Sequence, residues 1–65
     1  MMLKSLLEIF DKGTEISVFY IDNDGERKTI YTDLDGEPTV SVKYSDVYRA
    51  RVSDNGVLEC EVEEP

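Results

Sequence analysis

The sequence predicts an α+β domain that is mostly β, with an N-terminal amphipathic helix followed by a five-stranded antiparallel meander. Two observations carry this prediction. Residues 2–12 repeat their apolar side chains at helical spacing, and the rest of the chain alternates apolar and polar residues in short runs between turns rich in Asp and Gly. With 65 residues the chain makes one small domain, residues 1–65, of modest stability.

The predicted helix over residues 2–12 divides cleanly into an apolar and a polar sector. Such a helix must lie on an apolar surface. Gly13 suits the left-handed residue that ends a helix, whereas no side-chain cap is evident at the amino end. The apolar sector contains Met2, Leu3, Leu6, Leu7, Ile9 and Phe10.

Five strands are predicted, and the first is unusual because both of its faces are apolar. Ile16, Val18 and Tyr20 face one way, whereas Phe19 and Ile21 face the other. Either the strand bends within a small barrel, or another copy or a partner covers its second face. The predicted strands span residues 14–21, 26–32, 39–44, 47–53 and 57–62.

The last two strands form the most sharply specified part of the chain, because only one register satisfies both of their faces. A two-residue Asn55-Gly56 loop would place apolar residues opposite acids. A three-residue loop with Gly56 left-handed in a bulge instead brings apolar groups together on one face and opposite charges on the other. This register pairs Val52 with Leu58, Ala50 with Cys60, Tyr48 with Val62, Arg51 with Glu59 and Arg49 with Glu61.

One helix followed by five short strands leaves two architectures open. The sheet can stay open with the helix on one face, or it can curl into a small barrel. The order of elements resembles that of Sm-like and some SH3-like barrels, although the chain carries none of their residue motifs. The resemblance therefore concerns topology alone and implies no activity.

The residue inventory argues against catalysis and against bound cofactors or metals. The chain has no His, and its single Cys60 falls on the apolar face of a strand, where burial disfavours the thiolate. The Asp-rich turns fail as calcium loops, because alignment on Gly25 or Gly36 puts Tyr20 or Tyr31 at the first ligand position. Asp and Gly are also the residues that tight turns require. We therefore expect no enzyme activity, no cofactor and no metal.

The N-terminal segment carries no signal-peptide pattern, since Glu8 interrupts the apolar run, and no stretch reaches the length of a membrane span. A cytoplasmic location without membrane binding is the expectation.

Charge gives the main functional indication. Fifteen acids against seven bases leave a net charge of −8, which predicts no direct nucleic-acid binding and favours basic partners. In a meander, alternate turns lie at opposite ends of the sheet. One rim would then gather Asp22, Asp24, Glu26 and Asp46, and the other Asp33, Asp35, Glu37 and Asp54. Two acidic rims could imitate spaced phosphates. On the exposed face, Lys43, Arg49 and Arg51 are expected beside Glu59 and Glu61, which neutralise the two arginines across the hairpin. A basic stripe that contacts an acidic partner is the alternative.

The function predicted from these features is a small acidic, non-enzymatic protein-interaction module, an inhibitor or nucleic-acid mimic acting on a basic partner. The alternatives are a small-barrel accessory factor of a nucleoprotein complex and a structural subunit of a larger assembly. A homodimer is also considered, since an open sheet would leave Phe19, Ile21 and Tyr31 as an exposed apolar patch. The candidate interaction residues are Phe19, Ile21, Tyr31, Asp22, Asp24, Asp33 and Asp35.

Overall fold

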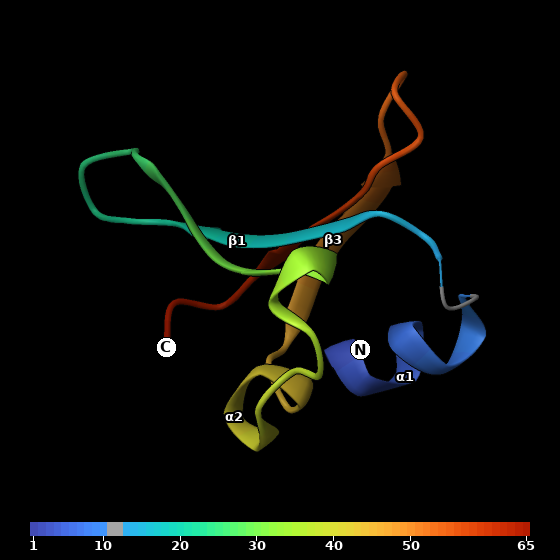
Figure 1. Ribbon diagram of the computed structural model, residues 1–65. Helices are drawn as coiled ribbons and strands as arrows, with labels where there is room; N and C mark the ends of the chain where they lie inside the picture. Colours follow the sequence, from blue (N-terminus) through green and yellow to red (C-terminus); the bar gives the residue numbers. More distant parts are fainter. Residues whose placement is uncertain (11–12) are drawn as a thin grey trace.

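The protein is described from a computed structural model, which defines residues 1–10 and 13–65. It is an α+β domain built mostly of strands (Figure 1). In chain order the elements are α1 (Leu3–Ile9), β1 (Ile16–Ile21), β2 (Arg27–Thr32), the 3-10 turn η1 (Asp33–Asp35), α2 (Val40–Lys43), β3 (Val47–Val52) and β4 (Leu58–Val62).

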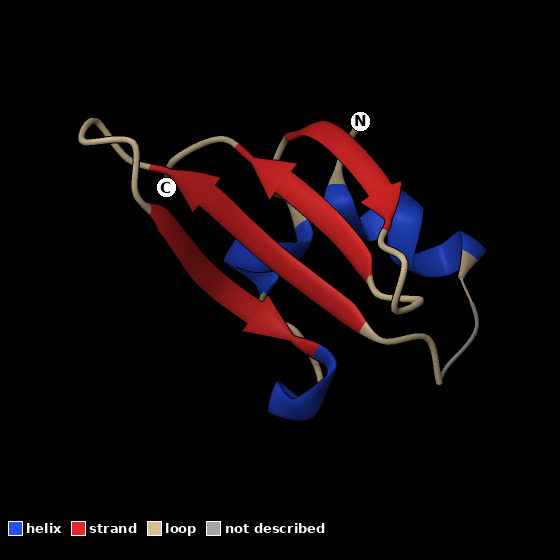
Figure 2. Ribbon diagram, turned by 90° about the horizontal axis from the view of Figure 1, so that it is seen from above, coloured by secondary structure: helices blue, strands red, loops and turns tan. Residues whose placement is uncertain are grey.

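The strands form an open four-stranded sheet in the order β2-β1-β4-β3 (Figure 2). The predicted five-stranded antiparallel meander is therefore wrong, because β1 and β4 pair in parallel and join two antiparallel hairpins. This order has a physical reason. The two central strands bring the most apolar core-facing residues together, whereas the charged β2 and β3 take the edges, where charge discourages pairing with other chains.

The third predicted strand, residues 39–44, is not a strand. Its alternating pattern belongs to the short helix α2, whose first turn is capped by Thr39 Oγ1 accepting the backbone N–H of Val42 at 3.4 Å. Of its apolar residues only Val42 packs against the core, whereas Val40 and Tyr44 are exposed. Six residues of alternating pattern are too few to distinguish a strand from a short helix. Here the side-chain cap at Thr39 stabilises the helix.

The hairpin of β3 and β4 confirms the predicted register over most of its length. Ala50 pairs with Cys60 and Arg51 with Glu59, and Gly56 has a φ of 82° in the loop. The prediction fails at the open end, where an irregularity at Tyr48 pairs Val47, instead of Tyr48, with Val62. One extra residue thus moves Tyr48 off the ladder.

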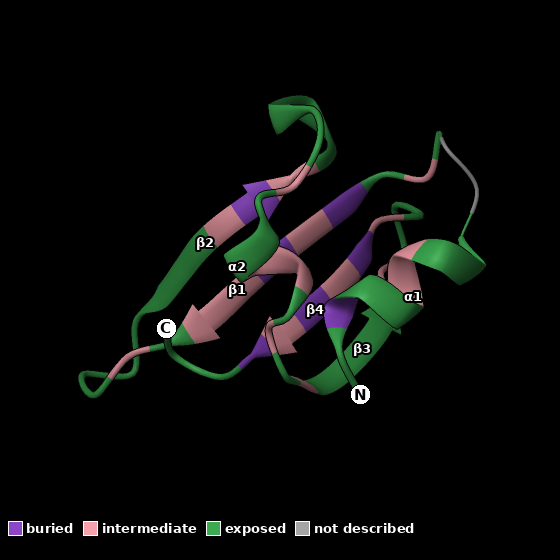
Figure 3. Cartoon of the chain, turned by 90° about the horizontal axis from the view of Figure 1, so that it is seen from below, coloured by how far each residue is buried: buried purple, intermediate pink, exposed green. Residues whose placement is uncertain are grey.

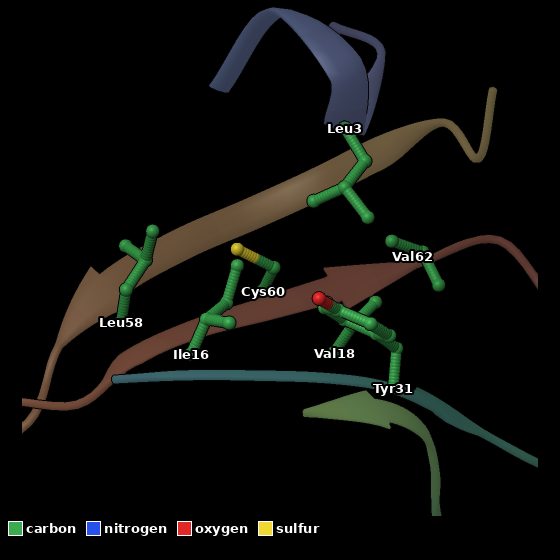
Figure 4. Packing of buried hydrophobic residues seen from close by; sticks show 7 residues of the cluster. All are labelled: Leu3, Ile16, Val18, Tyr31, Leu58, Cys60 and Val62. Carbon is green, nitrogen blue, oxygen red and sulfur yellow. The ribbon is translucent and has the colours of Figure 1, made fainter. Parts of the chain in front are cut away.

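Both helices lie on the same face of the sheet, which we call the core face (Figures 1 and 3). The opposite, outer face carries no described helix. The core is small, as expected for a chain of this length. Its buried residues are Leu3, Ile16, Val18, Tyr31, Leu58, Cys60 and Val62 (Figure 4).

Helix α1 is shorter than predicted and uses only part of its apolar sector. Leu3 is fully buried, whereas Ile9 is 69% and Phe10 37% exposed. The backbone of Leu3 bonds Ser45 O at 2.9 Å, which ties the start of α1 to the chain before β3. No side chain caps the amino end, as expected. The helix ends at Ile9, so Gly13 does not terminate it, and the predicted last turn at residues 11–12 lies outside the described residues.

Candidate interaction site

The turn that follows β2 forms what we call the second acidic end, composed of Asp33, Asp35 and Glu37. Asp33 Oδ1 accepts the backbone N–H of Ile16 at 3.0 Å, and Asp35 Oδ2 accepts that of Thr32 at 2.9 Å. These bonds fix two carboxylates against the sheet while leaving oxygens toward solvent. Among the described residues, no cation lies within ion-pair distance of the three acids.

The turn between β1 and β2 forms the first acidic end, composed of Asp22, Asp24 and Glu26. Asp22 Oδ1 accepts the backbone N–H groups of Asp24 and Glu26, each at 2.9 Å, so its role in the turn is structural. Lys28 Nζ lies 3.1 Å from Glu26 and 4.0 Å from Asp22. This end is therefore partly neutralised, unlike the second.

The two acidic ends lie at opposite ends of β1, as the sequence predicts. Asp33 is bonded to the first residue of the strand, Ile16, and Asp22 follows its last, Ile21. At about 3.3 Å per residue, a strand of this length separates the ends by about 20 Å. The rigid sheet thus holds two groups of acids at a fixed spacing.

A hollow of about 530 Å³ opens beside the second acidic end, between α1 and residues 33–43. Its floor is the core face of the sheet at Ile16, Tyr31 and Leu58, and its α1 wall includes Leu7 and Phe10. Sequence patterning could not reveal it, because a hollow depends on where two helices separated by some thirty residues come to lie. The one indication of it in the sequence was the apolar sector of residues 2–12, which is wider than the surface that α1 buries.

Tyr31 differs from its predicted position. An extra residue in β2, Ile30, shifts the register so that Tyr31 lies beside Val18 on the core face, where it is only 8% exposed. The predicted exposed patch with Phe19 and Ile21 is therefore not formed. The Tyr31 hydroxyl donates a hydrogen bond to Gly36 O. Burial, followed by the nearby charges of Glu37, Asp35 and Asp33, raises the pKa of Tyr31 above its ordinary value.

The outer face gathers all three arginines of the chain. The Arg27 guanidinium lies 3.8 Å from the centroid of the Phe19 ring, so this aromatic side chain is covered. Glu59 is bridged by Arg27 at 3.7 Å and Arg51 at 3.1 Å. Ile21 remains 42% exposed.

The expected set of cations on the exposed face needs two changes. Arg49 and Arg51 lie on the outer face, but Lys43 belongs to α2 on the core face and lines the hollow. Arg27, which was not predicted on this face, also lies there, because it pairs with Ile21 at the end of β1.

The remaining chemistry of the described residues is limited. Cys60 is fully buried, and burial raises the pKa of its thiol to about 11. Within residues 1–10 and 13–65, no group of three or more His, Cys, Asp or Glu side chains is placed to hold a metal ion. In the same part of the chain, no helix is both long and apolar enough to cross a membrane.

The chain matches no family model, and searches of curated proteins and of solved structures likewise return no match.

Proposed function

We propose that the protein is a non-enzymatic interaction module that binds a basic region of another protein through its acidic ends. The observation that carries this proposal is the second acidic end. Its Asp33 and Asp35 are held by backbone N–H groups, and no described cation neutralises them. Carboxylates fixed before binding lose little conformational freedom when a cationic partner arrives.

The distribution of charge supports the same proposal. The three arginines lie on the outer face beside Glu59 and Glu61, so the two ends of the sheet keep most of the excess negative charge. Such a field accelerates the encounter with a basic surface and makes the association sensitive to salt. Two acidic groups about 20 Å apart also support the narrower proposal of an inhibitor that imitates spaced phosphates.

The experiment is affinity purification of the intact chain from a lysate of the source cells, followed by mass spectrometry. The test variant, Asp24→Asn with Glu37→Gln, removes one acid from each end, and neither side chain accepts a hydrogen bond from the backbone in the described residues. A matched control, Glu61→Gln with Glu64→Gln, removes the same charge elsewhere.

The expected result is a basic protein that wild type and control retain and that the test variant loses. Equal recovery by all three proteins would contradict the proposal. Recovery of structural proteins encoded alongside this chain would favour a subunit of a larger assembly, and recovery of a nucleic-acid-handling protein would favour the mimic or an accessory factor.

A second copy of the chain is the alternative partner that we propose, on one observation. The outer face carries no described helix, and Ile21 is 42% exposed there. Sedimentation equilibrium of wild type and Ile21→Asp tests this alternative. Ile21 is chosen over Phe19 because Arg27 already covers the Phe19 ring. A concentration-dependent dimer that the substitution abolishes would support self-association, whereas a monomer at every concentration would exclude it.

A further inference from the structure

The hollow beside the second acidic end has the size and the floor of a binding site. Its volume of about 530 Å³ falls within the range of pockets that hold organic ligands, and Ile16, Tyr31 and Leu58 give it an apolar floor. Tyr31 is anchored by its bond to Gly36 O, which fixes this part of the floor to the turn that carries the acids.

The wall that α1 contributes includes two apolar side chains that are incompletely buried. Leu7 packs partly against the core, whereas Phe10, at the end of the helix, is 37% exposed. An aromatic ring left half in water beside an apolar floor gains free energy when another apolar group covers it. Because Phe10 is exposed, the hollow is open to a side chain carried by another molecule.

Charge around the hollow is unevenly distributed. Asp33 and Glu37 line it on the side of the turn after β2, and Asp35 lies close enough to raise the pKa of Tyr31 together with them. On the helices, Lys4 and Glu8 of α1 and Lys43 of α2 also line the hollow, so this side carries charges of both signs. Neither lysine lies within ion-pair distance of Asp33, Asp35 or Glu37. Only the side formed by the turn after β2 is uniformly negative, and that side favours a cation.

We propose that this hollow receives a single large apolar side chain of the partner protein, on a segment whose neighbouring lysine or arginine meets the second acidic end. The inference rests on the proposed function, since it specifies which part of a basic partner is bound. The apolar side chain supplies affinity by covering Phe10 at the edge of the hollow, and the cation supplies orientation.

Leu34 of a second copy does not fit the hollow. Leu34 is 91% exposed and would be an obvious insert, but it is flanked by Asp33 and Asp35. Its insertion would bring two like-charged turns together, which costs free energy. The negative charge of this turn therefore favours an apolar side chain with basic neighbours over Leu34 of a second copy.

The test uses the whole chain labelled with ¹⁵N and a blocked peptide of sequence Ser-Gly-Phe-Lys-Lys-Gly as the probe. Amide shifts at Ile16, Tyr31 and Leu58 are expected as the peptide is added. A peptide with Ser in place of Phe should bind about tenfold more weakly, because it loses the burial of one aromatic side chain. A peptide with Glu in place of both Lys should not bind.

Three variants of the protein locate the binding. Phe10→Ser, at a half-exposed position, should weaken the peptide about three- to tenfold with an unchanged fold by circular dichroism. Glu37→Gln should weaken it about two- to fivefold, as expected for an exposed ion pair. Glu64→Gln, which removes the same charge at a residue outside the lining of the hollow, is the matched control and should leave the affinity unchanged.

The outcomes separate this inference from the proposed function. Equal affinity for the Phe and Ser peptides, with shifts confined to residues 33–37, would overturn the hollow as a site and leave acidic recognition intact. Absence of any shift at millimolar peptide would also overturn it. The basic partner itself would be overturned if Glu37→Gln bound the Phe peptide as tightly as wild type does and if the peptide with Glu in place of both Lys also bound equally well.

Discussion

Asp33 Oδ1 accepts the backbone N–H of Ile16 at 3.0 Å, so the acid at the mouth of the hollow also anchors the first residue of β1. Ile16 is part of the buried core, and this N–H would otherwise lose a hydrogen bond on folding. The same carboxylate thus links the stability of the sheet to the charge of the second acidic end.

This bond gives the first prediction. Asp33→Ala should lower the free energy of unfolding by about 1–3 kcal/mol, because the partly buried N–H of Ile16 loses its acceptor. Asp33→Asn keeps an oxygen in place and should cost less than half as much. Urea denaturation followed by circular dichroism measures both, and equal losses for the two variants would show that charge, and not the hydrogen bond, provides the stability.

The second prediction separates the buried and exposed parts of α1. Leu3→Ala should cost about 2–5 kcal/mol, since Leu3 is fully buried in the core. Phe10→Ala should cost less than about 1 kcal/mol, although both residues belong to the apolar sector of the sequence. Chemical denaturation of the two variants checks this, and comparable losses would mean that Phe10 packs more deeply than the structure indicates.

The third prediction concerns alkaline pH. Burial raises the pKa of Cys60 to about 11 from an ordinary value of 9.0, so between these values the unfolded chain releases a proton that the folded chain keeps. The stability contributed by the neutral thiol is therefore fully present below pH 9 and falls as the pH rises toward 11, by an amount on the order of 2 kcal/mol.

Denaturant titrations across this range measure the loss of stability. Cys60→Ala should make the free energy of unfolding fall less steeply with pH over this range. The slope should not vanish, because the pKa of Tyr31 is also raised by burial and by its acidic neighbours. A slope unchanged by the substitution would assign the whole effect to other groups.

The fourth prediction concerns the contact between Arg27 and Phe19 on the outer face. With the guanidinium 3.8 Å from the ring centroid, a double-mutant cycle of Arg27→Ala and Phe19→Ala should give a coupling energy of about 0.5–1 kcal/mol. The measurement is the free energy of unfolding of the four proteins. Strictly additive losses would show that the two side chains do not interact in solution.

The fifth prediction is that the protein has no measurable affinity for duplex DNA or RNA at physiological salt, because its net charge of −8 opposes binding. Fluorescence anisotropy with labelled duplexes provides the measurement. Micromolar binding that weakens steeply with salt would contradict it and would point to the three arginines of the outer face. Arg49→Ser with Arg51→Ser would then identify the contact.

Local patterns determined the parts of this protein in which neighbouring residues decide the structure. The β3–β4 hairpin is the best example. Its alternation, its Gly56 turn and the opposite charges of Arg51 and Glu59 admit one register, and the structure has that register except near Tyr48. The division of Asp22 and Asp33 between opposite ends of the sheet was likewise predictable, because it follows from strand length and tight turns.

Only the tertiary structure decided which strands lie in the centre and which apolar residues are buried. The parallel pairing of β1 with β4 depends on contacts across some forty residues, for which local alternation carries no information. One extra residue at Ile30 placed Tyr31 on the core face, and a side-chain cap at Thr39 made a helix of an alternating segment.

The hollow was decided in the same way, since it lies between α1 and residues 33–43, which are distant in the sequence. The physical reason is common to all these cases. Short alternating segments have nearly equal local free energies in several arrangements, and burial of the few residues that form a small core selects among them.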